Sequence, residues 1–278
     1  MRTVLLVLEY DGSPFHGWQR QAGLPSVQEA VEAAFEAATG ERSAVHASGR
    51  TDAGVHALRQ CAHARTSTRL PDDRLHGALN AHLPPSVVVR EVRTVSPEFH
   101  ARFGARRKRY AYRVALQPVR PVLARGRALW LREEPDLDRM REAARLLLGR
   151  RDFRAFTAAD LAPRDTVRTL SSIHLRRTRE GLLFVLEADG FLPRMVRSIV
   201  GTLLEVGRGF LSPEDVAEAL RSRRRAGVGV TAPPEGLYLV RVKYPPGGGP
   251  PPSPVEPEAR MPEKGTRPGP ATRSRPSG

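Results

Sequence analysis

The chain has 278 residues, a formal net charge of +15, a hydrophobic content of 40% and a single cysteine. This length suffices for one large domain or two modest ones, each with its own core. One cysteine excludes an internal disulfide framework and a zinc site built on several thiolates, and it suits a reducing cytoplasm. Because no run approaches the roughly 18 apolar residues of a membrane span, and no signal peptide is recognisable, we expect a cytoplasmic protein without membrane contact.

Arginine supplies almost all of the positive charge, since the lysines are only Lys108, Lys243 and Lys264. A codon bias toward arginine explains the choice of arginine over lysine, but it does not explain an excess of basic over acidic residues. A strongly basic protein favours a polyanionic partner whose phosphates are bound by guanidinium groups. The charge therefore predicts a nucleic-acid partner.

Strand and helix signals alternate over the first hundred residues. Residues 3–10 (TVLLVLEY) predict a buried strand. Ser26 and Glu29 form a capping-box pattern at the start of a helix, whose apolar residues recur at helical spacing until Gly40. The other elements predicted here are strands at 57–65 and 86–92 and a short helix at 72–82.

A second unit repeats this mixture. Two strands at 166–178 and 182–190 flank Arg179-Glu180-Gly181, which is a hairpin signal. A helix is predicted at 192–206, with Pro193 in its first turn. The remaining elements are a strand at 109–116, a helix from Asp136 to Gly149, a helix from Ser212-Pro213 and a last strand at 236–244.

These elements predict an α+β fold in which helices are layered on a largely antiparallel sheet. We divide it into an N-terminal α/β subdomain (1–104) and a C-terminal one (105–244). Residues 245–278 differ from both, with eleven prolines and six glycines in 34 positions. Such a segment buries too little apolar surface to offset its conformational entropy, so we expect a disordered tail.

One polar loop carries the candidate chemistry: ASGRTDAGVHA, residues 47–57. A run this polar, broken by glycines, is not expected to be core. Aspartate beside glycine most often caps a turn, and that interpretation of Asp52 stays open. The alternative is a catalytic carboxylate in a cleft, which needs a cationic partner such as Arg194 or Arg197 to stay ionised.

Motifs for cofactors and metals are missing from the chain. It has no Walker loop, no GxGxxG after a strand, no HExxH and no CxxC. Asp52 and His56 together offer two metal ligands, which is too few, and the eight histidines form no clear ligand set. We expect neither a metal nor a cofactor.

The loop GRTDAGVHA (49–57) resembles the signature loop of the TruA family of tRNA pseudouridine synthases. Seven further blocks are similar to that family in the same order: 8–21, 26–34, 80–85, 99–103 (FHARF), 108–114 (KRYAYRV), 191–207 and 232–240. The resemblance covers residues 3–244. It implies the pseudouridine synthase fold, with two α/β subdomains that share a central sheet and an active-site cleft between them.

The resemblance also implies roles for individual residues. It makes Asp52 the catalytic carboxylate, paired with Arg197, and places Tyr110 against the target uracil. It makes Leu237 the apolar floor of the pocket, and it gives Arg50 the task of extruding the base or holding the RNA. Judged without the resemblance, Tyr110 is a strand aromatic, Arg197 a solvated helix residue and Leu237 plain core, and these readings stay open.

The implied substrate is the anticodon stem–loop of tRNA, at uridines 38, 39 and 40, bound by a homodimer. Isomerisation of uridine to pseudouridine involves no redox change and needs no cofactor. Pro193 and Arg194 stand where the family often has histidine or other polar residues, which leaves the contacts of Arg194 open. The competing functions are a non-catalytic RNA-binding protein or RNA chaperone, and a metal-dependent nuclease.

Overall fold

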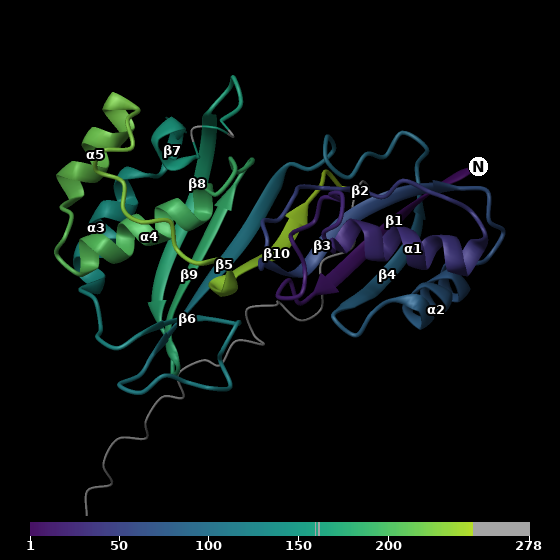
Figure 1. Cartoon of the computed structure of the whole chain (residues 1–278). Helices are drawn as coiled ribbons and strands as arrows, with labels where there is room; N and C mark the ends of the chain where they lie inside the picture. The colour runs from purple at the N-terminus through teal and green to yellow at the C-terminus, as the bar shows by residue number, and fades with distance from the viewer. Residues whose placement is uncertain (159, 161, 247–278) are drawn as a thin grey trace, which may run out of the picture.

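The computed structural model describes residues 1–158, 160 and 162–246. The predicted tail therefore lies outside the described residues except for its first two positions. One sheet runs through the described part in the order β4-β1-β3-β10-β5-β9-β8-β7, with β2 beside β3 and β6 beside β5 (Figure 1). Its strands are β1 (Arg2–Tyr10), β2 (His46–Ala47), β3 (His56–Thr66), β4 (Val87–Val95), β5 (Arg107–Leu116), β6 (Leu129–Leu131), β7 (Gly149–Asp152), β8 (Val167–Arg177), β9 (Gly181–Ala188) and β10 (Leu237–Lys243).

Helices cover both ends of this sheet. Helices α1 (Val27–Thr39) and α2 (Asp72–His82) lie over the end formed by β4, β1 and β3. The other end, formed by β9 and β8, carries the helices α3 (Leu137–Leu146), α4 (Met195–Gly207) and α5 (Pro213–Ser222). All strand pairs are antiparallel except β3–β10 and β5–β6, so the predicted α+β fold with a largely antiparallel sheet is confirmed.

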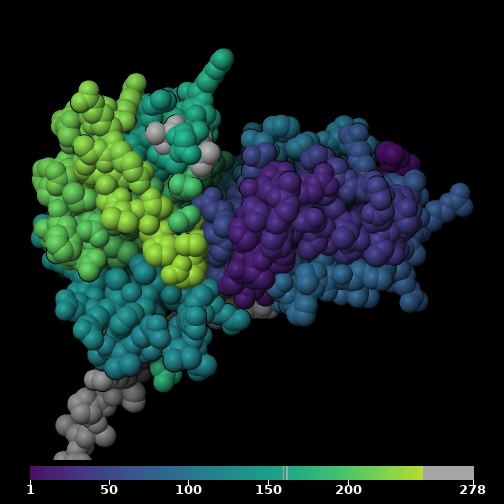
Figure 2. Space-filling view, viewed as in Figure 1, coloured from purple at the N-terminus to yellow at the C-terminus, as the bar shows by residue number. Residues whose placement is uncertain are grey.

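The last strand, β10, joins the two halves of the chain. Tyr238 pairs with His56 of β3 in a parallel ladder, and Leu239 pairs with Tyr110 of β5 in an antiparallel one. The sheet is therefore continuous across the two predicted subdomains, whose boundary at residue 104 stays a prediction. Figure 2 shows the halves side by side, with an indentation in the outline between them.

Capping residues explain most helix ends. The Ser26 hydroxyl accepts from the backbone N–H of Glu29 at 3.3 Å, which is one of the two bonds of the predicted capping box, and α1 ends at Gly40 in the left-handed region. The predicted first turn of α4 is wrong, because the helix begins only at Met195. Arg194 before it has a φ of 61°, and the Pro193 carbonyl accepts from the Thr157 hydroxyl at 2.9 Å. Pro193 therefore lies ahead of the helix.

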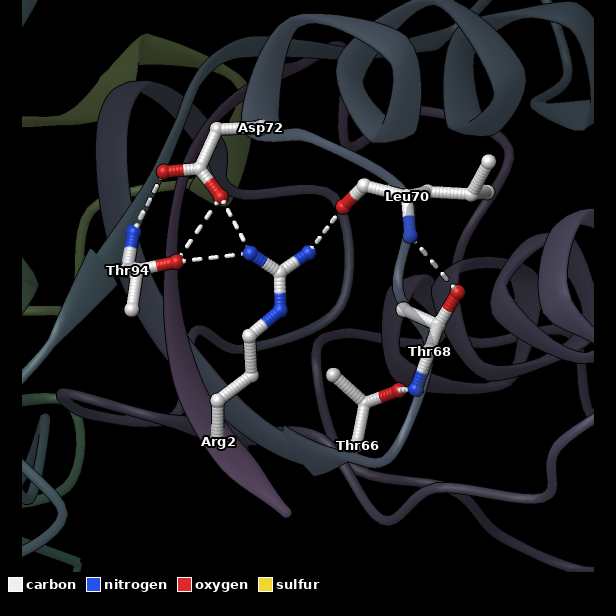
Figure 3. Close-up of polar contacts among 6 residues, drawn as sticks. All are labelled: Arg2, Thr66, Thr68, Leu70, Asp72 and Thr94. Atoms are coloured by element: carbon white, nitrogen blue, oxygen red, sulfur yellow. Dashed lines mark hydrogen bonds and ion pairs between the residues drawn. The ribbon is translucent and has the colours of Figure 1, made fainter.

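A polar network fastens the start of β1 to α2 and β4 (Figure 3). Nη1 of Arg2 donates to Oδ1 of Asp72 and to Oγ1 of Thr94, both at 2.8 Å, and Nη2 donates to the Leu70 carbonyl. Asp72 also accepts from the backbone N–H of Thr94 at 2.7 Å. Because Asp72 is the first residue of α2, its negative charge also favours the positive end of the helix dipole.

A buried carboxylate, Glu187 on β9, links the three central strands. It is 4% exposed and accepts from Nε of Arg109 on β5 at 2.8 Å and from Nζ of Lys243 on β10 at 2.9 Å. Burial on its own raises the pKa of Glu187, but the hydrogen bonds from Lys243 and Arg109 outweigh it and hold the pKa below its ordinary value. Glu187 is therefore ionised at neutral pH and neutralises cations on β5 and β10.

We expect Glu187→Gln to lower the free energy of unfolding by about 1–3 kcal/mol, because hydrogen bonds to a buried charge are lost. The control is Glu180→Gln, which removes an exposed carboxylate 2.7 Å from Arg113 and should cost at most about 1 kcal/mol. Urea unfolding at pH 7 measures both. Since folding lowers the pKa of Glu187, its contribution is present at neutral pH and is lost as the pH falls through the folded-state pKa. Equal losses in the two variants would contradict the central role of Glu187.

Candidate active site

Asp52 lies in a tight turn that leads into β3. Its backbone carbonyl accepts from the N–H of Val55 at 3.1 Å, and Gly54 at the third position of the turn has a φ of 75°. This is the geometry of a type II turn, in which the third position favours glycine. The backbone of Asp52 thus has the turn role expected beside glycine, while its side chain is directed elsewhere.

The segment before α1 holds this turn in place. The backbone N–H of Trp18 donates to the Thr51 carbonyl at 3.0 Å, and the Phe15 carbonyl accepts from the N–H of Gly54 at 3.2 Å. Gly17 has a φ of 95°, and a Cβ on it would lie 2.5 Å from the Thr51 carbonyl oxygen. Position 17 therefore requires glycine, because its φ is positive and because a Cβ there would clash with the Thr51 carbonyl.

Buried hydrogen bonds support the loop from below. The Ser48 hydroxyl donates to Oε1 of Gln60 at 2.7 Å, and Nε2 of Gln60 donates to the Gly49 carbonyl at 2.9 Å. The hydroxyls of Tyr10 and Thr51 are 2.9 Å apart. The expectation that this run lies outside the core is wrong for Ser48 and Thr51, which are 0% and 7% exposed, because their polar atoms have partners within the fold.

His56 is also buried, and its contacts are structural. Its Nδ1 accepts from the backbone N–H of Gly12 at 3.1 Å, and its ring stacks on Tyr238 with centroids 4.7 Å apart. Burial lowers the pKa of His56 despite the nearby Asp11, so the ring is neutral at pH 7. Across residues 1–158, 160 and 162–246, no three His, Cys, Asp or Glu side chains are grouped so as to hold a metal ion.

The side chain of Asp52 meets Arg197 from the other half of the chain. Nη1 of Arg197 donates to Oδ2 of Asp52 at 2.8 Å, and Nε donates to the Ala232 carbonyl at 2.8 Å. The Arg197 carbonyl in turn accepts from the Ala232 N–H at 3.0 Å. Arg197 is therefore fixed through its backbone and its side chain, whereas Arg194 is exposed. The Asp52 side chain, 34% exposed, remains open to a ligand.

Tyr110 lies beside this pair on β5. It is 7% exposed, and its ring meets Phe191 edge-on with centroids 5.1 Å apart. Burial, with smaller contributions from Tyr10 and Asp52, raises the pKa of Tyr110 well above its usual range. Its hydroxyl therefore stays protonated at neutral pH and is able to donate a hydrogen bond.

The remaining predicted residues take different positions. Leu237 is 5% exposed at the start of β10, opposite Tyr112, and Arg50 is exposed two residues before Asp52. Sequence reasoning did not single out Gln60 or Phe191. Phe191 carried a signal, because it belongs to the block 191–207, whereas Gln60 is recognisable only from the hydrogen bonds it makes.

Comparison with known proteins shows the family. Residues 6–104 and 143–245 match the family described as tRNA pseudouridine synthase. A protein of Acetivibrio thermocellus named tRNA pseudouridine synthase A is 41% identical over 88% of this chain and all of its own length. A protein of the same name from Bradyrhizobium sp. is 45% identical over 86% of this chain and 98% of its own length. Another, from Agrobacterium fabrum, is 42% identical over 86% of this chain and 91% of its own length.

The chain therefore belongs to the tRNA pseudouridine synthase family, which is a family of isomerases. The recognition made from the sequence blocks is confirmed. In the part of the chain that the structure describes, no helix has the length and apolar character needed to cross a membrane.

The fit between Gly17 and the Asp52 loop makes a stability prediction. Gly17→Ala should destabilise the protein more than Gly23→Ala, by a further ~1–3 kcal/mol, because only the first drives a Cβ into a packed carbonyl. Gly23 is the matched control: it also has a positive φ, at 72°, but nothing lies within 4 Å of its Cβ position. Urea unfolding of both variants measures the difference. Equal losses would mean that the loop yields to the methyl group without cost.

Proposed function

We propose that this protein isomerises uridine to pseudouridine at positions 38, 39 and 40 in the anticodon stem–loop of tRNA, with Asp52 as the catalytic carboxylate. The observation that carries the proposal is the ion pair of 2.8 Å between Asp52 and Arg197, with Tyr110 beside it. The family supports the reaction class, and the names of the relatives support tRNA as the substrate. The proposal includes a cytoplasmic homodimer.

The chemistry of this isomerisation is compatible with a site that has one carboxylate in a fixed position. The N1–C1′ bond of the uridine breaks, the base turns, and C1′ joins C5. C5 loses its proton and N1 gains one, so atoms and electrons balance without a redox partner. A carboxylate serves here as a nucleophile or as a counter-charge for a positive sugar. Arg197 holds Oδ2 of Asp52, and this bond keeps the carboxylate oriented toward the bound nucleotide.

The target base must leave its stack to react, and an aromatic side chain is the usual surface that receives it. We assign this role to Tyr110, whose ring is supported by Phe191. Because its hydroxyl stays protonated, Tyr110 is suited to donating a hydrogen bond to the base. We also assign to this hydroxyl the proton exchange of the rearrangement. Leu237 contributes apolar surface below the base, and the exposed Arg50 contacts the RNA at the loop.

Charge supports an RNA substrate. A net charge of +15 on 278 residues favours binding to a phosphate backbone, whose contribution weakens with salt. Such contacts position a nucleic acid, while the chemistry depends on a few residues at the site. Binding and catalysis are therefore expected to be separable by mutation.

The first test replaces the carboxylate. Wild-type protein, incubated with unmodified tRNA in the absence of metal, should form pseudouridine that is detected as carbodiimide-resistant adducts. Asp52→Asn should form none, while its affinity for tRNA stays within a few-fold. Asp138→Asn, which changes an exposed aspartate on α3, is the control and should keep full turnover.

The other possible results of this experiment would favour a competing function or refute the role of Asp52. Intact RNA without pseudouridine from the wild-type protein would favour an RNA-binding protein or chaperone, and cleaved RNA would favour a nuclease. Normal turnover by Asp52→Asn would refute the catalytic assignment of Asp52.

The second test concerns Arg197. Arg197→Lys keeps the charge, but one ammonium group cannot replace an Nε bonded to Ala232 and an Nη1 bonded to Asp52 at the same time. We expect single-turnover rates about 10–100-fold lower, equivalent to about 1.4–2.7 kcal/mol in the barrier. Arg194→Lys, in the same sequence block but exposed, should change the rate little. A wild-type rate in Arg197→Lys would show that the two-point fixation is dispensable.

A further inference from the structure

Lys108 places a half-buried ammonium group at the edge of the Asp52 loop. It stands two residues before Tyr110 on β5, so both side chains lie on the same face of the strand, about 7 Å apart along it. Its Nζ donates to the Ser48 carbonyl at 2.7 Å. A Cβ on Gly49 would lie 2.8 Å from this nitrogen, so the glycine leaves the space that the ammonium group occupies.

No carboxylate of the described residues forms an ion pair with this lysine, although buried charges are normally paired. Lys243, the other lysine in the described part, shows the usual arrangement, since its Nζ lies 2.9 Å from Glu187. Burial, together with the charges of Arg102 and Arg168, lowers the pKa of Lys108 to about 8. Both of these neighbouring charges are positive.

The two arginines come from different segments. Arg168 on β8 lies over Gly190, where its Nε is 3.4 Å from the position of a Cβ, and its Nη1 donates to the Val167 carbonyl. Its nearest carboxylate oxygen, on the exposed Asp165, is 3.7 Å away. Arg102 is exposed between β4 and β5, with its guanidinium 5.7 Å from the centre of the Phe103 ring. Ala188 pairs with both Lys108 and Leu170, so Lys108 and Arg168 lie at the same end of the sheet. Arg102 comes from the segment just before β5, and its charge also lowers the pKa of Lys108.

We infer that Lys108, Arg102 and Arg168 form a binding subsite for a backbone phosphate of the RNA, next to the nucleotide held by Asp52 and Tyr110. An ammonium group has three donors and Ser48 takes one, which leaves two for phosphate oxygens. A phosphate also supplies a negative charge, which no carboxylate of the described residues provides beside Lys108. The inference rests on the proposed function, because it takes RNA as the ligand.

Salt dependence of binding tests the subsite. In an Asp52→Asn background, which binds without turnover, log K for unmodified tRNA is measured against log salt concentration. Lys108→Met should reduce the slope by about 0.7–0.9, the value for one lost phosphate contact, and Lys108→Arg should restore it. Lys243→Met removes a lysine whose charge Glu187 already neutralises, and it should leave the slope unchanged.

Two further variants keep the test decisive if Lys108→Met does not fold. Arg102→Met removes an exposed side chain and Arg168→Met removes a half-buried one, and each should reduce the slope. Unchanged slopes in folded Lys108→Met, or in both arginine variants, would overturn the subsite. A lower turnover of Lys108→Met made in the wild-type background, together with an unchanged slope in the Asp52→Asn background, would overturn it too, because Lys108 would then only support the loop. Failure of the wild-type protein to form pseudouridine would overturn the proposed function, whereas the slopes report on RNA binding alone.

Discussion

The contact between Asp52 and Arg197 depends on how one short segment joins the two halves of the chain. Ala232 bonds to Arg197 at the backbone and at the side chain, Pro234 packs against Gly54 of the Asp52 turn, and the Pro233 carbonyl accepts from the hydroxyl of Tyr112. The chain then enters β10, which pairs with both β3 and β5. The segment that closes the sheet is thus also the one that positions the arginine and supports the turn.

Cations near this junction fall into two groups. Those of the central strands, Arg109 and Lys243, share the buried carboxylate of Glu187, so their charge is neutralised within the fold. Lys108, one position before Arg109, faces the opposite side of β5, and its hydrogen-bond partner among the described residues is the Ser48 carbonyl. Alternation along a single strand therefore separates a cation that stabilises the sheet from the cation that we assign to the phosphate subsite.

Local signals predicted the elements well where local chemistry decides them. The helix at 72–82 has the predicted bounds, and α5 begins at Pro213 as predicted, after Ser212, which forms a complete capping box with Asp215. Prediction was wrong where tertiary contacts compete. Pro193 fits a first helical turn, but Arg194 adopts a left-handed conformation and α4 begins after it. Ser48 and Thr51 are polar and yet buried, because Gln60 and Tyr10, from β3 and β1, satisfy their hydroxyls.

The sequence by itself determined the α+β class, the glycine-bounded loop that presents Asp52, the basic character and the resemblance to a family. Glycines and a capping serine act through the backbone within a few residues, so their effect can be predicted from the sequence. The residues by themselves left Arg194 and Arg197 open as partners of Asp52, and the resemblance implied Arg197. The tertiary structure brings Arg197 to Asp52 across 145 positions, and among the described residues it pairs no carboxylate with Lys108. Contacts of this kind follow from the order in which strands pair, and that order is set by the packing of the whole sheet rather than by any local pattern.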